Sequence, residues 1–228
     1  MLGKVIVTGG SGFIGRHLIN HMVGLGYRVF NIDIRCPEES GHRGMWRQGS
    51  ILDPKGLDKI FSEIRPQYVV HLAARAVMEG RSLSDFRENT EGTANVLAAI
   101  CSVGNVERLI VASTQHVRKP GSPMPAHDKD YAPYMLYGAS KVVTENLTRN
   151  DGHLKHWTII RPTAVWGRYH PSQVSGLWRL IYRNMYFHPA HDSVVRAYGY
   201  VDNVVWQIER ILSLDSGLTH GRTLYVGD

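Results

Sequence analysis

The sequence predicts an α/β fold in which a parallel β-sheet is covered by helices on both faces. Short apolar runs rich in β-branched residues recur at residues 4–8, 27–32, 68–71, 108–112 and 157–160. Stretches with helical character separate them, at residues 14–24, 54–63, 83–103 and 137–149. Strands that are apolar on both sides and alternate with helices are typical of a parallel sheet buried between two helical layers.

Local signals support these elements in order. The first helix follows a glycine-rich turn, and Asp53 is a candidate N-cap for the second, where Pro54 fits the first turn. Residues 118–133 are rich in Pro, Gly, Ser, Asp and Lys, which predicts a loop at the edge of the sheet.

The pattern weakens beyond Gly167. We expect a helix at 174–184, an irregular segment at 188–189, a strand at 194–201, a helix at 203–212 and a last strand at 223–226. Residues 1–167 are therefore predicted to form the main domain. Residues 168–228 are predicted to form a small, partial lobe interleaved with the last strands of the sheet.

Composition excludes several classes of protein. Among 228 residues, 43% are hydrophobic and 20% are charged, which is typical of a soluble globular protein and predicts a cytoplasmic one. No apolar run is long enough for a signal peptide core or a membrane span. Two cysteines cannot form a disulfide framework, and the 12 histidines lack metal-site spacing, so no metal is expected. The net charge of +6 comes from scattered basic residues, which favours an anionic small molecule over nucleic acid.

A strand, a glycine-rich turn and a helix follow one another at the N-terminus. Gly9 suits a tight turn, Gly12 a close approach of backbone to a pyrophosphate, and Gly15 close helix packing. The helix N-terminus adds amide groups that attract phosphate. Asp33 ends the second strand, where a carboxylate accepts hydrogen bonds from the adenosine ribose and disfavours a 2′-phosphate. These features predict a Rossmann doubly wound sheet that binds NAD, although Arg35 could accept the extra phosphate of NADP.

A candidate catalytic group lies on the helix at 137–149. Tyr137 and Lys141 are four residues apart and share one helix face. A nearby ammonium group favours the phenolate, so we expect Lys141 to lower the pKa of Tyr137 toward neutrality. Ser113 and Thr114 end the fourth predicted strand, where a hydroxyl could hold the same substrate oxygen.

Taken together, these motifs resemble the extended short-chain dehydrogenase/reductase family, in particular its NAD-dependent nucleotide-sugar epimerase/dehydratase branch. The residues that carry the resemblance are Thr8 to Gly15, Asp33, His71 to Ala74, Asn89 with Gly92 and Thr93, Ser113, Thr114, Tyr137, Lys141, Arg161, Pro162, and Arg196 with Tyr200 to Asp202.

The resemblance implies a role for each matching residue. Thr114, Tyr137 and Lys141 would be catalytic, and Ser113, His116 and Arg196 would contact a nucleotide sugar, with Arg196 at its diphosphate. The implied NAD-binding residues are Gly9, Gly12, Phe13, Ile14, Gly15, Asp33, Ser50, Ile51, Ala73, Ala74, Asn89, Tyr137, Lys141 and Pro162.

The sequence also departs from the family pattern. Ser50 follows Gly49 where relatives often have Asp, so the adenine contact should change to a hydroxyl or the backbone. Gln115 and His116 replace the Asp-Glu pair of dehydratases, which disfavours 4,6-dehydration. His116 is then an additional acid/base or simply a polar residue of the substrate loop. Ala164 replaces an asparagine that touches the substrate in many relatives. The given sequence ends at Asp228, where relatives usually continue into more of their substrate lobe.

We therefore expect an NAD-dependent nucleotide-sugar epimerase that works through a transient keto-sugar. The alternatives are an NAD(P)-dependent keto-sugar reductase with the same residues and a non-catalytic dinucleotide-binding protein. The resemblance also implies a homodimer formed by the helices at 83–103 and 137–149. The residues that could supply its apolar surface, or pack against the sheet instead, are Ala94, Leu97, Ala98 and Val142.

Overall fold

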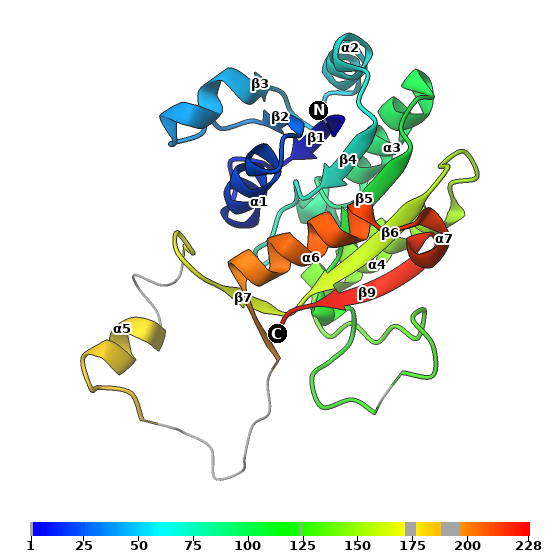
Figure 1. The fold of residues 1–228 in the computed structure, drawn as a ribbon. Helices are drawn as coiled ribbons and strands as arrows, with labels where there is room; N and C mark the ends of the chain where they lie inside the picture. Colours follow the sequence, from blue (N-terminus) through cyan, green and yellow to red (C-terminus); the bar gives the residue numbers. More distant parts are fainter. Residues whose placement is uncertain (1, 124, 172–176, 188–196) are drawn as a thin grey trace.

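The computed structural model describes residues 2–123, 125–171, 177–187 and 197–228. Within these residues the chain forms a sheet of seven parallel strands in the order β3-β2-β1-β4-β5-β6-β9 (Figure 1). The strands are β1 (Lys4–Thr8), β2 (Arg28–Asp33), β3 (Trp46–Gln48), β4 (Tyr68–His71), β5 (Arg108–Ala112), β6 (Trp157–Pro162) and β9 (Arg222–Val226). The strand order reverses at β1, which is the position where such sheets bind ligands at the carboxyl ends of their strands.

Helices cover both faces of this sheet. On one face, α1 (Phe13–Gly24) and α6 (Val201–Ser213) share a hydrophobic core with the strands (Figure 1). On the other face lie α2 (Pro54–Ile64), α3 (Glu91–Val103) and α4 (Leu136–Asn150), which bury a second core. Two-sided burial explains why successive inner residues of the central strands are apolar, and the predicted doubly wound Rossmann fold is confirmed.

Residues after 167 divide between two places. β7 (Ala164–Trp166) and β8 (Tyr198–Tyr200) pair in a small parallel sheet, and α5 (Leu177–Tyr182) lies beyond it, away from the main sheet (Figure 1). α6, the short α7 (Ser216–Thr219) and β9 return to the Rossmann sheet. The last strand is thus interleaved with the main domain, while the domain boundary at residue 167 stays a prediction.

Most predicted elements are present with ends shifted by a few residues. Asp53 caps α2, since its carboxylate accepts a hydrogen bond from the Gly56 amide at 3.1 Å. The helix expected at 174–184 is α5, and the strand expected at 194–201 is β8. Residues 174–176, 188–189 and 194–196 of these predictions lie outside the described residues. The three-residue strands β3 and β7 were not predicted, because so few residues carry no recognisable period.

The prediction of one continuous helix over residues 83–103 is wrong. A 3₁₀ helix at Leu83–Phe86 is followed by a turn, and α3 begins only at Glu91. Ser82 and Asp85 form a capping box at the start of the short helix. Asn89 in the turn hydrogen-bonds the backbone of Arg75 through its amide. Ser, Asp and Asn side chains that bond to the backbone compete with a helix in this way.

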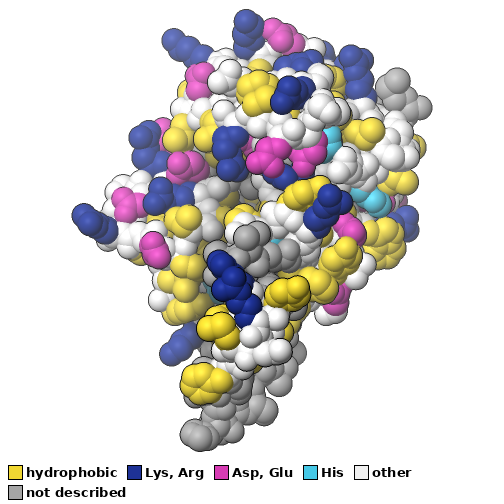
Figure 2. All heavy atoms as spheres, turned by 90° about the vertical axis from the view of Figure 1, so that its left-hand side faces the viewer, with side chains coloured by type: hydrophobic (Ala, Val, Ile, Leu, Met, Phe, Trp, Pro, Cys, Tyr) yellow, Lys and Arg dark blue, Asp and Glu magenta, His cyan; other side chains and the backbone are white. Residues whose placement is uncertain are grey.

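Two global features bear on the class of ligand. Within the described residues, no helix combines the length and the apolar character needed to cross a membrane. On the face shown in Figure 2, Lys and Arg side chains lie dispersed among Asp and Glu instead of in one continuous basic stripe.

Candidate functional site

The glycine-rich turn after β1 is shaped for close backbone approach. Gly9 has φ +74°, and a Cβ atom there would lie 2.7 Å from the amide nitrogen of Ala73. A Cβ atom on Gly15 would collide with the carbonyl of Gly9. Gly12 is the N-cap of α1 and caps it with no side chain, so the first-turn amides of the helix are available to an anion. This cradle fits the pyrophosphate of a dinucleotide.

Phe13 and Ile14 begin α1 directly behind this turn. The Phe13 ring packs edge-on against His17 at 5.8 Å and His170 at 4.8 Å between ring centroids. Ile14 packs against the hydrophobic core of its face. Their side chains are therefore used in packing, and what these two residues offer a phosphate is their backbone amides.

The second part of the candidate dinucleotide site is Asp33 at the end of β2. Its carboxylate accepts hydrogen bonds from the amides of Ser11 at 3.0 Å and Arg35 at 2.9 Å. The side chain is 8% exposed, so it is fixed in place yet reachable. The Ser11 hydroxyl donates to the Arg35 carbonyl and so ties the glycine turn to this loop. The sequence did not single out Ser11, although its place inside the turn was the available signal.

Ser50 and Ile51 serve local structure. The Ser50 hydroxyl accepts a hydrogen bond from the Leu52 amide at 3.1 Å. Ile51 is buried in the core, and its carbonyl accepts from the Asn95 amide group at 2.9 Å. Contact of either residue with adenine stays a prediction.

A buried polar chain links β1 to β4 beside the turn. The Thr8 hydroxyl hydrogen-bonds Nδ1 of His71 at 2.7 Å and accepts from the Ala73 amide at 3.2 Å. Nε2 of His71 lies 3.3 Å from the Thr93 hydroxyl. Burial lowers the pKa of His71 to about 3, so its imidazole is neutral. These contacts fix the backbone at Ala73, and NAD binding by Ala73 and Ala74 stays a prediction.

Asn89 is a support residue. It is fully buried, its amide bonds the Arg75 backbone twice, and it donates to the Ser140 hydroxyl at 2.8 Å. The Ser140 hydroxyl donates to the Tyr137 carbonyl at 2.7 Å. Asn89 therefore joins the loop after β4 to the helix that carries Tyr137, and its part in NAD binding stays a prediction.

The three candidate catalytic residues come together at the carboxyl end of β5. Thr114 follows β5 and is buried, and its side chain hydrogen-bonds Tyr137. Lys141 is buried one turn after Tyr137 on α4 and donates to the Ala112 carbonyl at 2.8 Å. Burial lowers the pKa of Lys141 to about 8, against an opposing effect of Glu145.

The expected effect of Lys141 on Tyr137 is wrong. Burial raises the pKa of Tyr137 above its ordinary value, and the hydrogen bond with Thr114 opposes this only in part. The reason is that Tyr137 is just 8% exposed, and a low dielectric disfavours the phenolate. The Lys141 ammonium group donates a hydrogen bond to the Ala112 carbonyl, and no effect of its charge on Tyr137 is resolved.

Ser113 belongs to a buried ionic cluster that the sequence did not reveal. Its hydroxyl donates to Glu145 at 2.6 Å, and Arg161 makes two hydrogen bonds of 2.8 Å to the same carboxylate. Tyr131 donates to Glu145 at 2.8 Å, and the Asp128 carbonyl accepts from Arg161 at 2.5 Å. The cluster ties the loop before α4 to β6. Glu145 follows Lys141 by four residues on the same helix face, which was the signal that sequence reasoning missed.

The remaining candidates fall in different places. His116 follows Thr114 and lies with its ring centroid 6.4 Å from that of Tyr137. Pro162 ends β6, where it pairs with Val226 of β9. Arg196, expected at the substrate diphosphate, lies outside the described residues. The described residues hold no group of three or more His, Cys, Asp or Glu side chains placed for a metal ion.

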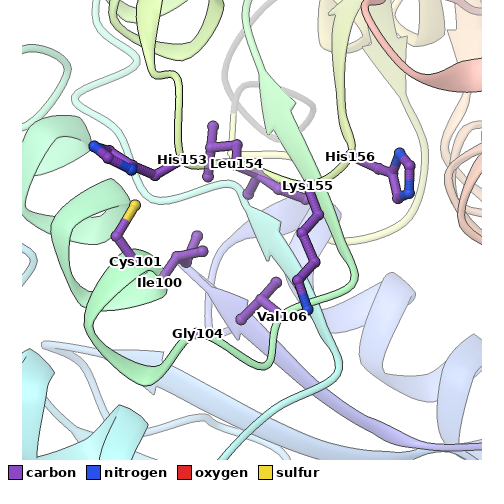
Figure 3. A pocket seen from close by; sticks show the side chains of 9 residues that line it. Ile100, Cys101, Gly104, Val106, His153, Leu154, Lys155 and His156 are labelled. Carbon is purple, nitrogen blue, oxygen red and sulfur yellow. The ribbon is translucent and has the colours of Figure 1, made fainter.

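A small cavity lies at the opposite end of the sheet. Figure 3 shows it between α3 and the turn before β6, with Cys101, His153 and Lys155 among its lining residues. Its volume of about 40 Å³ is an order of magnitude below that of typical ligand pockets. This cavity is therefore too small to hold a dinucleotide or a nucleotide sugar.

Comparison with known proteins gives a family match over nearly the whole chain. Residues 5–227 match the model of the NAD dependent epimerase/dehydratase family. A UDP-glucose 4-epimerase 1 of Oryza sativa subsp. japonica is 29% identical over 178 residues, which are 70% of this chain and 50% of that protein. A 2-alkyl-3-oxoalkanoate reductase of Stenotrophomonas maltophilia (strain K279a) is 30% identical over 72% of this chain and 51% of its own length. The chain thus spans about half the length of these relatives.

A solved structure shows the same fold over nearly the whole chain. The UDP-glucose 4-epimerase of Thermus thermophilus in complex with NAD superimposes with a TM-score of 0.78 at 26% identity, covering 98% of this chain and 77% of that chain. The resemblance stated from the sequence is confirmed, and with it the prediction of NAD as the cofactor of the family.

Proposed function

Because this chain belongs to the NAD dependent epimerase/dehydratase family, we propose that it binds NAD and interconverts two epimers of a nucleotide-activated sugar through a transient ketone on the sugar. The chemistry that NAD supplies when bound is reversible hydride transfer. The observation that carries the proposal is the convergence of Tyr137, Thr114 and Lys141 in one buried group at the carboxyl end of β5.

Each residue has a distinct part in this chemistry. Tyr137, as the phenolate, takes the proton of the sugar hydroxyl when that carbon is oxidised, and returns the proton when the ketone is reduced. Thr114, which already hydrogen-bonds Tyr137, orients that hydroxyl against the phenol. Lys141, buried one helical turn after Tyr137 and held by the Ala112 carbonyl, would bind the dinucleotide. The uncapped amides of α1 and the carboxylate of Asp33 hold the dinucleotide.

The test is incubation of the purified protein with NAD and a panel of UDP-, GDP- and dTDP-sugars, with products followed by NMR. Turnover should fall by roughly 10²-fold or more in Tyr137→Phe, because a positioned acid/base is worth that much. Tyr27→Phe is the matched control, because it also removes one buried phenol hydroxyl. That hydroxyl hydrogen-bonds Glu209 at 3.4 Å and has no part in the proposed catalytic group. No turnover of any sugar, or equal rates in Tyr137→Phe and the wild type, would rule out the epimerase.

A second candidate is a reductase that uses the same residues once. Burial keeps the Tyr137 phenol protonated, and a neutral phenol is the proton donor that ketone reduction needs. One matching relative is itself named a reductase. Stoichiometric loss of the absorbance of the reduced nicotinamide distinguishes this activity from an epimerase, which returns its hydride. Calorimetry that detects NAD but no nucleotide sugar would instead favour a non-catalytic dinucleotide-binding protein.

A further inference from the structure

The backbone of His116 contacts Thr114 and the residue that follows Tyr137. Its amide donates to Oγ1 of Thr114 at 3.3 Å. Its carbonyl lies directly against Gly138, where a Cβ atom would collide with it. Gly138 follows Tyr137 in the first turn of α4. The position of the imidazole is therefore set by the same contacts that position Thr114 and Tyr137.

One nitrogen of the His116 imidazole has a hydrogen-bond partner. Nδ1 lies 2.8 Å from the Tyr134 hydroxyl, and the two rings are 5.9 Å apart in an edge-on arrangement. The imidazole ring is also 6.4 Å from the ring of Tyr137, at 60°. In the part of the chain that the structure describes, no protein group hydrogen-bonds Nε2 of His116.

The pair has a preferred arrangement of protons. Burial lowers the pKa of His116, so the imidazole is neutral near pH 7 and carries one proton. A phenol hydroxyl is a far stronger acid than a neutral imidazole N–H, so Tyr134 is the donor and Nδ1 the acceptor. The imidazole proton is then on Nε2, which becomes a hydrogen-bond donor.

We propose that Tyr134 is a positioning residue that holds His116 in the Nε2–H form, and that His116 is a specificity-determining residue for the sugar. Its Nε2–H donates to an oxygen on the carbon next to the one on which Tyr137 acts. The ring centroids of His116 and Tyr137 are 6.4 Å apart, a separation at which Nε2 and the phenol oxygen can reach neighbouring oxygens of one sugar that lies against both rings. The pocket therefore takes a nucleotide sugar with a free hydroxyl or carboxylate oxygen at that neighbouring carbon. This inference rests on the proposed function.

The positioning role is tested without substrate. ¹⁵N NMR of the imidazole, with the signal assigned by its loss in His116→Gln, should show the Nε2–H tautomer in the wild type and a mixture of tautomers in Tyr134→Phe. Tyr198→Phe is the control, since Tyr198 is exposed like Tyr134 and belongs to β8. An unchanged tautomer in Tyr134→Phe would overturn the positioning role.

The specificity role is tested by pairing variants with substrate analogues. The accepted sugar is compared with its deoxy analogues at each carbon next to the epimerised one. For one analogue, kcat/KM of the wild type should fall about tenfold, mainly through KM, as expected for the loss of one hydrogen bond. His116→Gln, whose amide keeps a donor near the place of Nε2, should retain this discrimination, and His116→Leu should lose it.

The outcomes separate the two proposals. Equal NAD affinity and melting temperature in the variants show that they are folded. Turnover by the wild type with the same discrimination in His116→Leu overturns the specificity role alone. Absence of wild-type turnover on every sugar overturns the proposed function and the specificity role together.

Discussion

The buried carboxylate of Glu145 offers a quantitative test of how the loop before α4 is held. Its side chain is fully buried and accepts hydrogen bonds from Ser113, Tyr131 and both donor groups of a bidentate Arg161. Arg149 contributes a further contact at 3.3 Å. In Glu145→Gln the guanidinium of Arg161, which is only 1% exposed, would be left buried without its counter-charge.

Removing one partner of a buried ion pair costs about 3–5 kcal/mol of unfolding free energy. That is a large part of the roughly 5–15 kcal/mol of a typical domain. For a chain of this size, 1 kcal/mol corresponds to about 2–4 °C, so the melting temperature should fall by about 6–20 °C. Turnover should fall as well, because Tyr131 and the loop around it lose their anchor beside Tyr137.

The assay is thermal and urea unfolding of Glu145→Gln beside the wild type. Glu91→Gln is the matched control, since it breaks an Arg–Glu pair of the same 2.8 Å length that is exposed on α3 and should change little. A double variant, Glu145→Met with Arg161→Met, should recover much of the loss, because apolar side chains leave no unpaired charge. A loss below about 1 kcal/mol in Glu145→Gln would refute the anchoring role of this cluster.

Four further predictions concern the dinucleotide site, the helix beside it and the proposed dimer. The pKa of His71 is about 3 in the folded protein against 6.5 ordinarily, so below pH 6.5 the unfolded chain takes up a proton that the folded chain does not. Urea unfolding at several pH values should therefore show the unfolding free energy falling by up to about 1.4 kcal/mol per pH unit as the pH is lowered, and falling less steeply in His71→Asn. The pKa of Lys141 is lowered to about 8, so burying its charge costs stability below that pH, and this cost fades as the pH rises toward 10.5. Lys141→Met should therefore unfold at a higher urea concentration than the wild type at pH 7 and should lose this advantage at pH 10. The variant should also be inactive. Asp33→Ser should lower the ratio of the NADP to the NAD dissociation constant about tenfold or more, measured by calorimetry, because the carboxylate that repels a 2′-phosphate is gone while Arg35 stays. We also propose a homodimer through α3 and α4. Ala98 is exposed on α3, so light scattering should give a dimer mass for the wild type at micromolar concentration and a monomer mass for Ala98→Glu. A monomer mass for the wild type would contradict the proposal.

The sequence predicted the parts of the fold in which local and global signals agree. Strands buried on both faces carry a run of apolar residues in their middle, so β1, β4 and β5 were predicted with their observed ends. Asp53 and Pro54 marked the start of α2 because a helix needs a cap there. Gly9 and Gly15 stand where the backbone comes too close for a side chain.

What the sequence did not predict depends on contacts between distant segments. The break at Asn89 arises from hydrogen bonds to Arg75, fourteen residues away. Whether Leu97 packs in the core or on an outer surface was undecided from helical periodicity, and the structure places it in the core. The raised pKa of Tyr137 follows from its depth of burial, which spacing along a helix does not reveal.

Calorimetric titration of the purified protein with NAD is the sharpest test of whether the glycine turn binds a dinucleotide. We expect saturable binding of one NAD per chain that survives in Tyr137→Phe and is lost in Gly15→Val, where the new side chain would collide with the Gly9 carbonyl. Absence of any heat of binding for oxidised or reduced nicotinamide dinucleotide in the folded wild type would contradict it.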